Sequence, residues 1–179
     1  MKKFIILFLL LCSHSFLQAQ TQNLHQFKMK DIDGKEVDFS SLKGKKVLIV
    51  NTASKCGNTP QYAVLEELYK KYGGDKFTIV GFPANNFMRQ EPGTNAEIKE
   101  FCTSKYAVSF LMMEKISVKG NDIDPLYKWL TTKELNGKAD YEVGWNFSKF
   151  LIDENGNVAG HVSPSKSPDC EEIINFITK

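Results

Sequence analysis

Cys56 is the residue of this sequence whose setting best suits chemistry. It lies in the segment 51–60, between an apolar strand and a helix expected to begin at Thr59-Pro60. Unpaired N–H groups at a helix start attract negative charge, and Lys55 adds a positive charge, so both favour the thiolate that nucleophilic attack requires. Gly57 has no side chain to cover the sulfur. The segment predicts a reactive thiol; the alternative is a structural cysteine packed under the loop.

The spacing around Cys56 limits the kind of chemistry. A dithiol oxidoreductase of thioredoxin type needs a Cys-x-x-Cys pair, which the turn lacks. A copper-delivery protein would need a second Cys where Pro60 stands, and neither His25 nor His161 lies in a metal-ligand pattern. A cysteine–histidine hydrolase stays open, because its histidine can come from any part of the chain. One attacking sulfur helped by non-ionisable neighbours fits the spacing best.

The elements that must position Cys56 alternate between strands and helices. The expected set comprises a hairpin around Asp33-Gly34, strands at 46–51, 77–82 and 112–118, helices opening at Thr59-Pro60, Thr94, Asp124-Pro125 and Ser167-Pro168, and a hairpin at 149–153 and 158–162. This order predicts an α/β protein with a mixed central sheet flanked by helices. It is the order of a thioredoxin-like fold with an N-terminal β-hairpin extension.

Residues 1–20 are expected to be a secretory signal peptide and not part of the fold. Two lysines precede the apolar run 4–11, and a more polar stretch containing Ala19 follows. The run is shorter than the roughly 20 apolar residues that span a bilayer. We therefore expect export to the periplasm or cell envelope, with secretion as the alternative. Lipidation at Cys12 is disfavoured, because bulky leucines precede it.

The composition of the 179 residues excludes several other classes. A hydrophobic fraction of 42% is too high for disorder, and 4 Cys are too few for a disulfide-dense scaffold. The formal charge of +2 gives no basic field for nucleic acid. Removal of Lys2 and Lys3 with the leader leaves 21 basic and 21 acidic side chains. Residues 21–179 are thus expected to form a single neutral domain with no nucleic-acid partner and no membrane span.

Two further segments carry a family resemblance together with the Cys56 turn. Residues 81–93 contain Asn-Asn-Phe-Met-Arg-Gln-Glu-Pro-Gly, and residues 144–150 read Gly-Trp-Asn-Phe-Ser-Lys-Phe. In this order the three motifs resemble the glutathione peroxidase family, over about residues 27–177. The resemblance implies a thiol-based peroxidase that reduces hydrogen peroxide and organic or lipid hydroperoxides.

The resemblance also implies a catalytic tetrad of Cys56, Gln90, Trp145 and Asn146, with Cys56 as the peroxidatic residue. Amide and indole N–H groups can stabilise a thiolate and the charge on a leaving hydroxide. The product is a sulfenic acid on Cys56. No cofactor or metal is implied, only an external thiol reductant. Taken alone, Gln90 could be a loop amide, Trp145 a core aromatic and Asn146 the start of a glycosylation sequon.

Cys102 matches the resolving cysteine of the thioredoxin-dependent, non-selenium branch of the family. The resemblance implies a Cys56–Cys102 disulfide that a thioredoxin-like dithiol donor reduces, with glutathione as the other possible reductant. The alternative is a core thiol, because Cys102 shares an apolar helical face with Ile98 and Phe101. Bridged cysteines need Cα atoms within about 7 Å, so a buried Cys102 predicts a locally unstable helix around 101–106. Cys170 is expected to be a buried spectator.

The sequence departs from the family in places that bear on substrate and assembly. Met88-Arg89 replaces a pair that is usually small, which adds bulk and charge beside Gln90, and Ala84 stands where many members have Cys. The stretch 131–144 lacks the longer insertion of the tetrameric animal enzymes, which implies a monomer with an open site. The alternative function is a peroxide-sensing relay that passes oxidation to a partner protein. A metal-delivery module is a third, and the missing second cysteine argues against it.

Overall fold

The computed structural model describes residues 22–179, so the expected signal peptide lies outside the described residues. The strands are β1 (Lys28–Lys30), β2 (Glu36–Asp38), β3 (Lys46–Thr52), β4 (Phe77–Pro83), β5 (Leu111–Met112), β6 (Lys149–Ile152) and β7 (Val158–Val162). The α-helices are α1 (Gln61–Tyr72), α2 (Asn95–Tyr106), α3 (Pro125–Thr131), α4 (Lys133–Asn136) and α5 (Glu171–Thr178). Short 3₁₀ turns, η1 (Leu24–Gln26) and η2 (Phe39–Leu42), flank the first hairpin.

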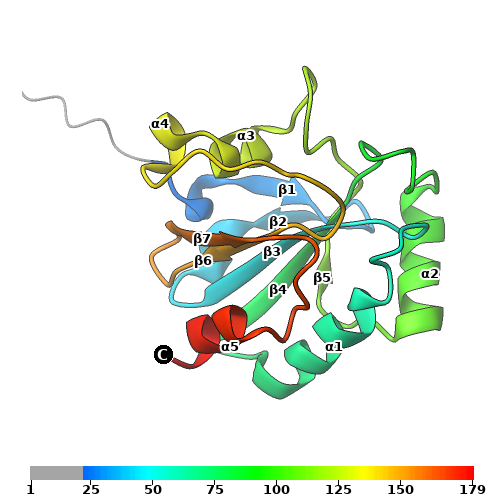
Figure 1. Cartoon of the computed structure of the whole chain (residues 1–179), viewed down its shortest axis with the longest axis horizontal. Coiled ribbons are helices and arrows are strands. Elements are labelled where there is room, and N and C mark those ends of the chain that lie inside the picture. The colour runs from blue at the N-terminus through cyan, green and yellow to red at the C-terminus, as the bar shows by residue number, and fades with distance from the viewer. Residues whose placement is uncertain (1–21) are drawn as a thin grey trace, which may run out of the picture.

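The central sheet has the strand order β5-β4-β3-β6-β7 (Figure 1). β3, β4 and β5 run parallel, whereas β6 is antiparallel to β3 and β7 is antiparallel to β6. β1 and β2 form a separate antiparallel hairpin. This arrangement confirms the predicted thioredoxin-like fold, with its mixed sheet and N-terminal hairpin.

Helices cover both faces of the sheet. α1 and α5 lie on one face, and α3 and α4 lie on the other (Figure 1). β3 is buried from Val47 to Thr52, as expected for a central strand with both faces covered. Its side chains divide between two core clusters, because neighbouring residues of a strand point to opposite faces: Val47 and Ile49 contribute to one, Leu48 and Val50 to the other.

The predicted strand at 112–118 is wrong beyond its first residue. β5 ends at Met112 because the following N–H groups bond to several different segments. Glu114 N–H donates to Lys30 O, Ile116 N–H to Pro83 O and Val118 N–H to Asn86 Oδ1. These donors tie the chain across one end of the sheet instead of forming a ladder with one neighbour.

Two helix starts also differ from the prediction. α1 begins at Gln61 and Thr59 does not cap it, because the Thr59 hydroxyl is used within the Cys56 turn. α5 begins at Glu171, after a separate turn in which Cys170 N–H donates to Ser167 O. By contrast, the capping box predicted at Thr94 is present at the start of α2.

Three loops meet at one edge of the sheet. β3 and β4 are parallel and in register from Lys46–Phe77 to Thr52–Pro83, so both carboxyl ends lie at the same edge. β6 is antiparallel to β3, with Val50 opposite Lys149, so the amino end of β6 lies there too. The loops that carry the three sequence motifs must therefore converge.

None of the helices in residues 22–179 is long and apolar enough to cross a membrane.

Candidate active site

The loop after β3 folds back so that backbone N–H groups face the sulfur of Cys56. The Thr59 hydroxyl accepts from Cys56 N–H at 3.0 Å and donates to Ala53 O at 2.8 Å. Thr59 N–H donates to Cys56 O at 3.0 Å. This tight turn places Asn58 N–H 3.3 Å from Cys56 Sγ. An N–H group donating to sulfur stabilises negative charge on it, and the half-buried Cys56 remains open to solvent on one side.

The loop after β4 places Gln90 beside this turn. Phe87–Gln90 is a tight turn in which Gln90 N–H donates to Phe87 O at 3.1 Å. Its two central residues, Met88 and Arg89, have φ angles of 48° and 53°. Positive φ at both positions is the pattern of a type I′ turn, which favours glycine. Gln90 O in turn accepts from Lys55 N–H at 3.0 Å, which joins this loop to the residue preceding Cys56.

The segment before β6 is held by Asn51, a fully buried residue near the end of β3. Asn51 Nδ2 donates to Trp145 O at 3.2 Å, and Asn51 Oδ1 accepts from Ser148 N–H at 3.0 Å. Phe147 adopts a φ of 71° within this bend, and its N–H donates to Asn51 O. The bend fixes Trp145 and Asn146 at the edge where the other two loops end.

Direct contacts connect the three loops into one site. Asn146 Nδ2 donates to Gln90 Oε1 at 2.9 Å, and the rings of Trp145 and Phe87 lie 5.4 Å apart. Asn58 Nδ2 donates to Asn146 O at 3.3 Å, which connects the third loop to the Cys56 turn. The structure thus brings together all four residues that the sequence indicated. Within residues 22–179, the side-chain N–H groups of Gln90 and Trp145 make no hydrogen bond, and only the amide oxygen of Gln90 is used.

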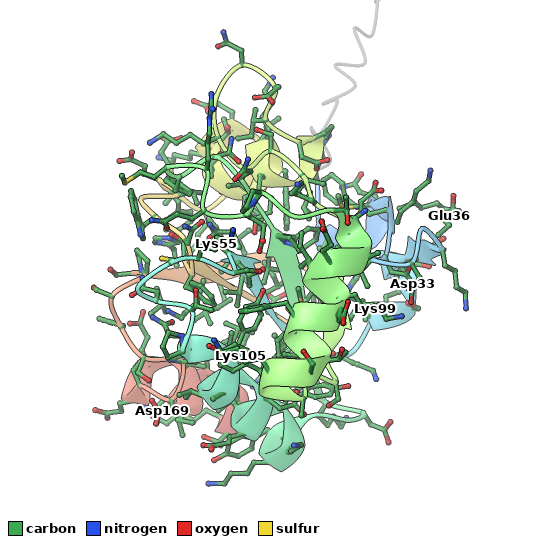
Figure 2. The ribbon with its side chains drawn as sticks, turned by 90° about the vertical axis from the view of Figure 1, so that its right-hand side faces the viewer. Asp33, Glu36, Lys55, Lys99, Lys105 and Asp169 are labelled. Atoms are coloured by element: carbon green, nitrogen blue, oxygen red, sulfur yellow. The ribbon has the colours of Figure 1, made fainter. Side chains whose placement is uncertain are left out.

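A cavity of about 360 Å³ separates the Cys56 turn from α2. In Figure 2, Lys55 lies on the loop beside α2, and the cavity is lined by Ser54, Lys55, Glu91, Pro92, Gly93, Glu97, Ile98 and Phe101. Glu91 is only 1% exposed, and burial raises the pKa of its carboxyl group. Ser54 Oγ donates to Glu91 Oε2 at 3.0 Å, whereas Glu91 Oε1 is buried without a partner.

Cys102 lies in the core and not at this edge. It is 1% exposed on α2, and burial raises the pKa of its thiol to about 11. Its neighbours include Tyr62 and Ile98. Cys56, Cys102 and Cys170 are all free thiols in this state. Cys170 is half-buried and precedes α5, so it is less enclosed than a fully buried spectator.

The two histidines of the described residues pack elsewhere. His25 lies against Gly156, and His161 packs on Phe150 with tilted rings whose centroids are 4.8 Å apart. Burial lowers the pKa of both imidazoles. Neither histidine is a hydrogen-bond partner of Cys56 in residues 22–179. The same residues contain no group of three or more side chains that could hold a metal ion.

Sequence reasoning missed several residues that build the site. Asn58 contacts both Cys56 and Asn146, and Asn51 holds the Trp145 segment. Glu91 follows Gln90 directly, and a carboxylate next to a predicted active-site residue was a signal that could have been used. Asn58 had no such signal, because an asparagine in a turn is usually explained by turn geometry alone.

Comparisons with known proteins agree with this geometry. Residues 24–131 match the family model described as "Glutathione peroxidase". The chain is 46% identical over 157 residues to "Glutathione peroxidase homolog BsaA" of Halalkalibacterium halodurans, covering 85% of this chain and 99% of that one. It is 45% identical over 161 residues to "Glutathione peroxidase-like peroxiredoxin 2" of Saccharomyces cerevisiae, covering 89% and 99%. The fold is similar to the crystal structure of Trgpx in its apo form, with a TM-score of 0.67, 39% identity and coverage of 88% and 97%.

Proposed function

Because this chain belongs to the glutathione peroxidase family, we propose that its thiol peroxidase activity is carried by Cys56, with Gln90, Trp145 and Asn146 as its catalytic partners. The enzyme reduces hydroperoxides. Hydrogen peroxide and organic or lipid hydroperoxides are its proposed substrates. The observation that carries the assignment is the N–H group of Asn58 directed at Cys56 Sγ, next to the linked amides of Gln90 and Asn146.

The first step follows from these groups. The Cys56 thiolate attacks one peroxide oxygen, and the O–O bond breaks as the new S–O bond forms. Sulfur is oxidised to a sulfenic acid, while the other oxygen leaves as an alcohol or water after taking a proton. Gln90 Nε2 and Trp145 Nε1 donate to the oxygen on which negative charge develops, in the way that oxyanion donors stabilise a transition state. None of these donors titrates near neutral pH, so the step does not depend on a histidine.

The second step uses Cys102 as the resolving thiol. Its sulfur attacks the Cys56 sulfenic acid, a disulfide forms, and the hydroxyl leaves as water with the thiol proton. Burial of Cys102 on α2 means that the helix must open first. The cavity between the Cys56 turn and α2 supplies space for this movement. A thioredoxin-like dithiol protein then reduces the disulfide, and glutathione is the competing donor to be tested.

Steady-state peroxide consumption tests this proposal. The assay compares a thioredoxin/thioredoxin reductase system with glutathione, for the wild type and for Cys56→Ser, Cys102→Ser and Cys170→Ser. Cys56→Ser should abolish turnover with both donors. Cys102→Ser should abolish turnover driven by thioredoxin, whereas Cys170→Ser serves as a matched control with wild-type turnover.

Each outcome bears on a different part of the assignment. Full activity in Cys56→Ser would contradict the main proposal. Thioredoxin-driven turnover in Cys102→Ser would remove only the resolving role. If neither donor supports turnover of the wild type while Cys56 is still oxidised, the protein acts instead as a peroxide sensor that passes oxidation to a partner.

The cellular location and the oligomeric state of the enzyme are part of the same proposal. We place it in the periplasm or cell envelope as a monomer, because residues 1–20 have the pattern of a signal peptide and the stretch 131–144 is short. Cell fractionation and sedimentation of the purified protein test the two statements. Cytoplasmic recovery or a stable tetramer would contradict them.

A further inference from the structure

We propose that Glu91 is the general base of the resolving step: its carboxylate takes the thiol proton of Cys102 as the Cys102 sulfur attacks the Cys56 sulfenic acid. The inference rests on the proposed function and assigns a further residue to its second step. It depends on where Glu91 lies relative to the two cysteines, on an unused oxygen of its carboxylate and on the charged groups around it.

Glu91 lies between the segments that carry the two cysteines. It lines the cavity of about 360 Å³ together with the two residues that precede Cys56 and with Ile98 and Phe101 of α2. Ile98 and Cys102 belong to the same core cluster, and Phe101 packs against it. Burial raises the pKa of the Cys102 thiol most, and the negative charge of Glu91 raises it further. The carboxylate is therefore near Cys102 before the helix opens, and beside the turn that Cys102 must reach.

One oxygen of this buried carboxylate is unused. Glu91 Oε2 accepts from Ser54 Oγ at 3.0 Å, whereas Oε1 is buried without a hydrogen-bond partner among residues 22–179. The main chain of the residue is anchored, because Glu91 N–H donates to Asn85 Oδ1 at 2.9 Å and Glu91 O accepts from Lys115 Nζ at 3.3 Å. A buried polar atom without a partner costs free energy. A firmly held carboxylate with such an oxygen is suited to a proton donor that arrives only during the reaction.

The charged and titratable groups near Glu91 come from several elements. They are Lys55 of the Cys56 turn, Tyr62 of α1, Glu97 and Cys102 of α2, and Lys115 after β5. Burial raises the pKa of Glu91, and Ser54, Lys115 and Lys55 each lower it again in part. A carboxylate with a raised pKa is a stronger base than an exposed one, and the two lysines favour its ionised form near neutral pH. Both properties suit a general base.

The proposed step balances without any further reagent. The Cys102 S–H proton passes to Glu91 Oε1 while the electron pair of that sulfur forms the S–S bond with Cys56. The S–O bond of the sulfenic acid breaks, and its oxygen leaves with the bonding pair and takes the proton from Glu91 to form water. The Cys102 sulfur is oxidised, the Cys56 sulfur is reduced, and the carboxylate is regenerated.

Rapid-quench kinetics after a pulse of hydrogen peroxide test the assignment. In a Cys170→Ser background, alkylation and mass spectrometry give the rate of Cys56 oxidation and the rate of disulfide formation separately. Glu91→Gln should lower the rate of disulfide formation about a hundredfold, a typical size for general base catalysis, because glutamine can keep the contact with Ser54 but cannot take the proton. Glu100→Gln is the matched control and should keep the parent rate, since it removes an exposed carboxylate of α2.

The pH profile distinguishes a base from a structural residue. In the parent, the rate of disulfide formation should rise with pH as the Glu91 carboxyl ionises, and should level off above its raised pKa. In Glu91→Gln this rise should be absent, and the remaining rate should increase only toward the pKa of the thiol. An unchanged profile, an equal loss of rate in Ser54→Ala or an equal fall in the rate of Cys56 oxidation would overturn the proposal.

Hydrogen exchange separates proton transfer from helix opening. The amides of residues 102–108 in the reduced protein report how often this part of α2 opens. They should exchange at the parent rate in Glu91→Gln, because the proposed role of the carboxylate begins after opening. Exchange that slows as much as disulfide formation would assign the effect to the stability of the helix and overturn the proposal.

Reaction of Cys102 with an external disulfide separates this proposal from the proposed function. In Cys12→Ser/Cys56→Ser/Cys170→Ser, Cys102 is the only thiol of the chain, and its attack on dipyridyl disulfide requires the same loss of a proton. If Glu91 were only a neighbouring negative charge, Glu91→Gln would speed this attack by lowering the pKa of the thiol. Slower attack near neutral pH supports the base even if peroxidase turnover fails. Equal or faster attack overturns it even if the Cys56–Cys102 disulfide forms.

Discussion

At the scale of single residues, the site is a set of neutral donors arranged around one sulfur. Cys56 receives the Asn58 N–H, and the side chains of Gln90 and Asn146 are linked to each other. Asn58 also uses its side chain, donating to Asn146 O and to Pro164 O at 3.3 Å each. Asn58 therefore determines both the environment of the sulfur and the position of the loop that carries Asn146.

Asn58→Ala should lower kcat/KM for hydrogen peroxide about tenfold. The substitution removes two side-chain hydrogen bonds, each contributing about 1 kcal/mol, and loosens the turn that presents the N–H to sulfur. Stopped-flow measurement of Cys56 oxidation gives the rate of the step directly. Asn136→Ala is the control, because Asn136 also donates to two carbonyl groups but does so near α4. A rate in Asn58→Ala equal to that of the wild type would show that the turn does not depend on this side chain.

At the scale of elements, the two ends of α2 are closed in different ways. Thr94 and Glu97 close the amino end with a reciprocal capping box. The carboxyl end terminates at Ala107, which has a left-handed φ of 52°, where glycine is the usual residue. Cys102 lies in the last turns before this strained residue. The unequal ends favour local opening of the segment 101–106 predicted from the sequence.

Ala107→Gly should make that opening rarer. Glycine removes the strain of about 1 kcal/mol that alanine carries in the left-handed region, so the free energy of unfolding should rise by a similar amount. The rate of disulfide formation after a peroxide pulse should fall, and hydrogen exchange of the amides of residues 102–108 should slow. Oxidation of Cys56 precedes the opening and provides the internal control. Faster disulfide formation in the variant would show that Cys102 reaches Cys56 without unwinding of α2.

At the scale of the whole molecule, a buried lysine connects the sheet to the active-site loops. Lys149 on β6 is fully buried, and its Nζ donates to Lys166 O at 2.7 Å and to Ser163 O at 3.5 Å. Between these two residues, Pro164 O accepts from Asn58 Nδ2 and Gln61 Nε2. Lys149 thus holds the loop 163–166 in place, and this loop in turn holds the Cys56 turn through Asn58. Burial lowers the pKa of Lys149 to about 8, an effect that negative charge on the nearby Cys170 sulfur partly offsets.

The lowered pKa of Lys149 predicts how stability changes with pH. Below about pH 8 the ammonium is charged in the folded and unfolded chains alike. Between that value and the ordinary 10.5, the unfolded chain binds more protons than the folded chain, so stability rises with pH. In a Cys170→Ser background, the free energy of unfolding relative to Lys149→Met should rise by on the order of 2 kcal/mol from pH 8 to pH 10.

Urea unfolding at a series of pH values measures this difference. Lys76→Met in the same background provides the control for the loss of a lysine at an exposed position. A flat difference for Lys149→Met would mean that the buried ammonium keeps its proton through this range.

The sequence by itself determined the fold class, the family and the identities of the four catalytic candidates. Apolar runs and capping residues fix β3, β4 and α2 locally, and the three motifs are contiguous segments with distinctive residue types. It also located the unusual Met88-Arg89 pair. The end of β5 could not be predicted, because the N–H groups that follow it bond to residues distant in the chain. The starts of α1 and α5 differ from the prediction because Thr59 and Ser167 each take part in a separate local turn.

Only the tertiary structure decided which residues meet and which stay apart. The parallel register of β3 and β4 and the antiparallel β6 bring three loops to one edge, where Asn58, Asn51 and Glu91 join the predicted residues. Burial placed Cys102 in the core, which makes movement of α2 part of the proposed cycle. Spacing along a chain specifies local conformation, whereas burial and the partners of polar groups depend on segments that only folding brings together.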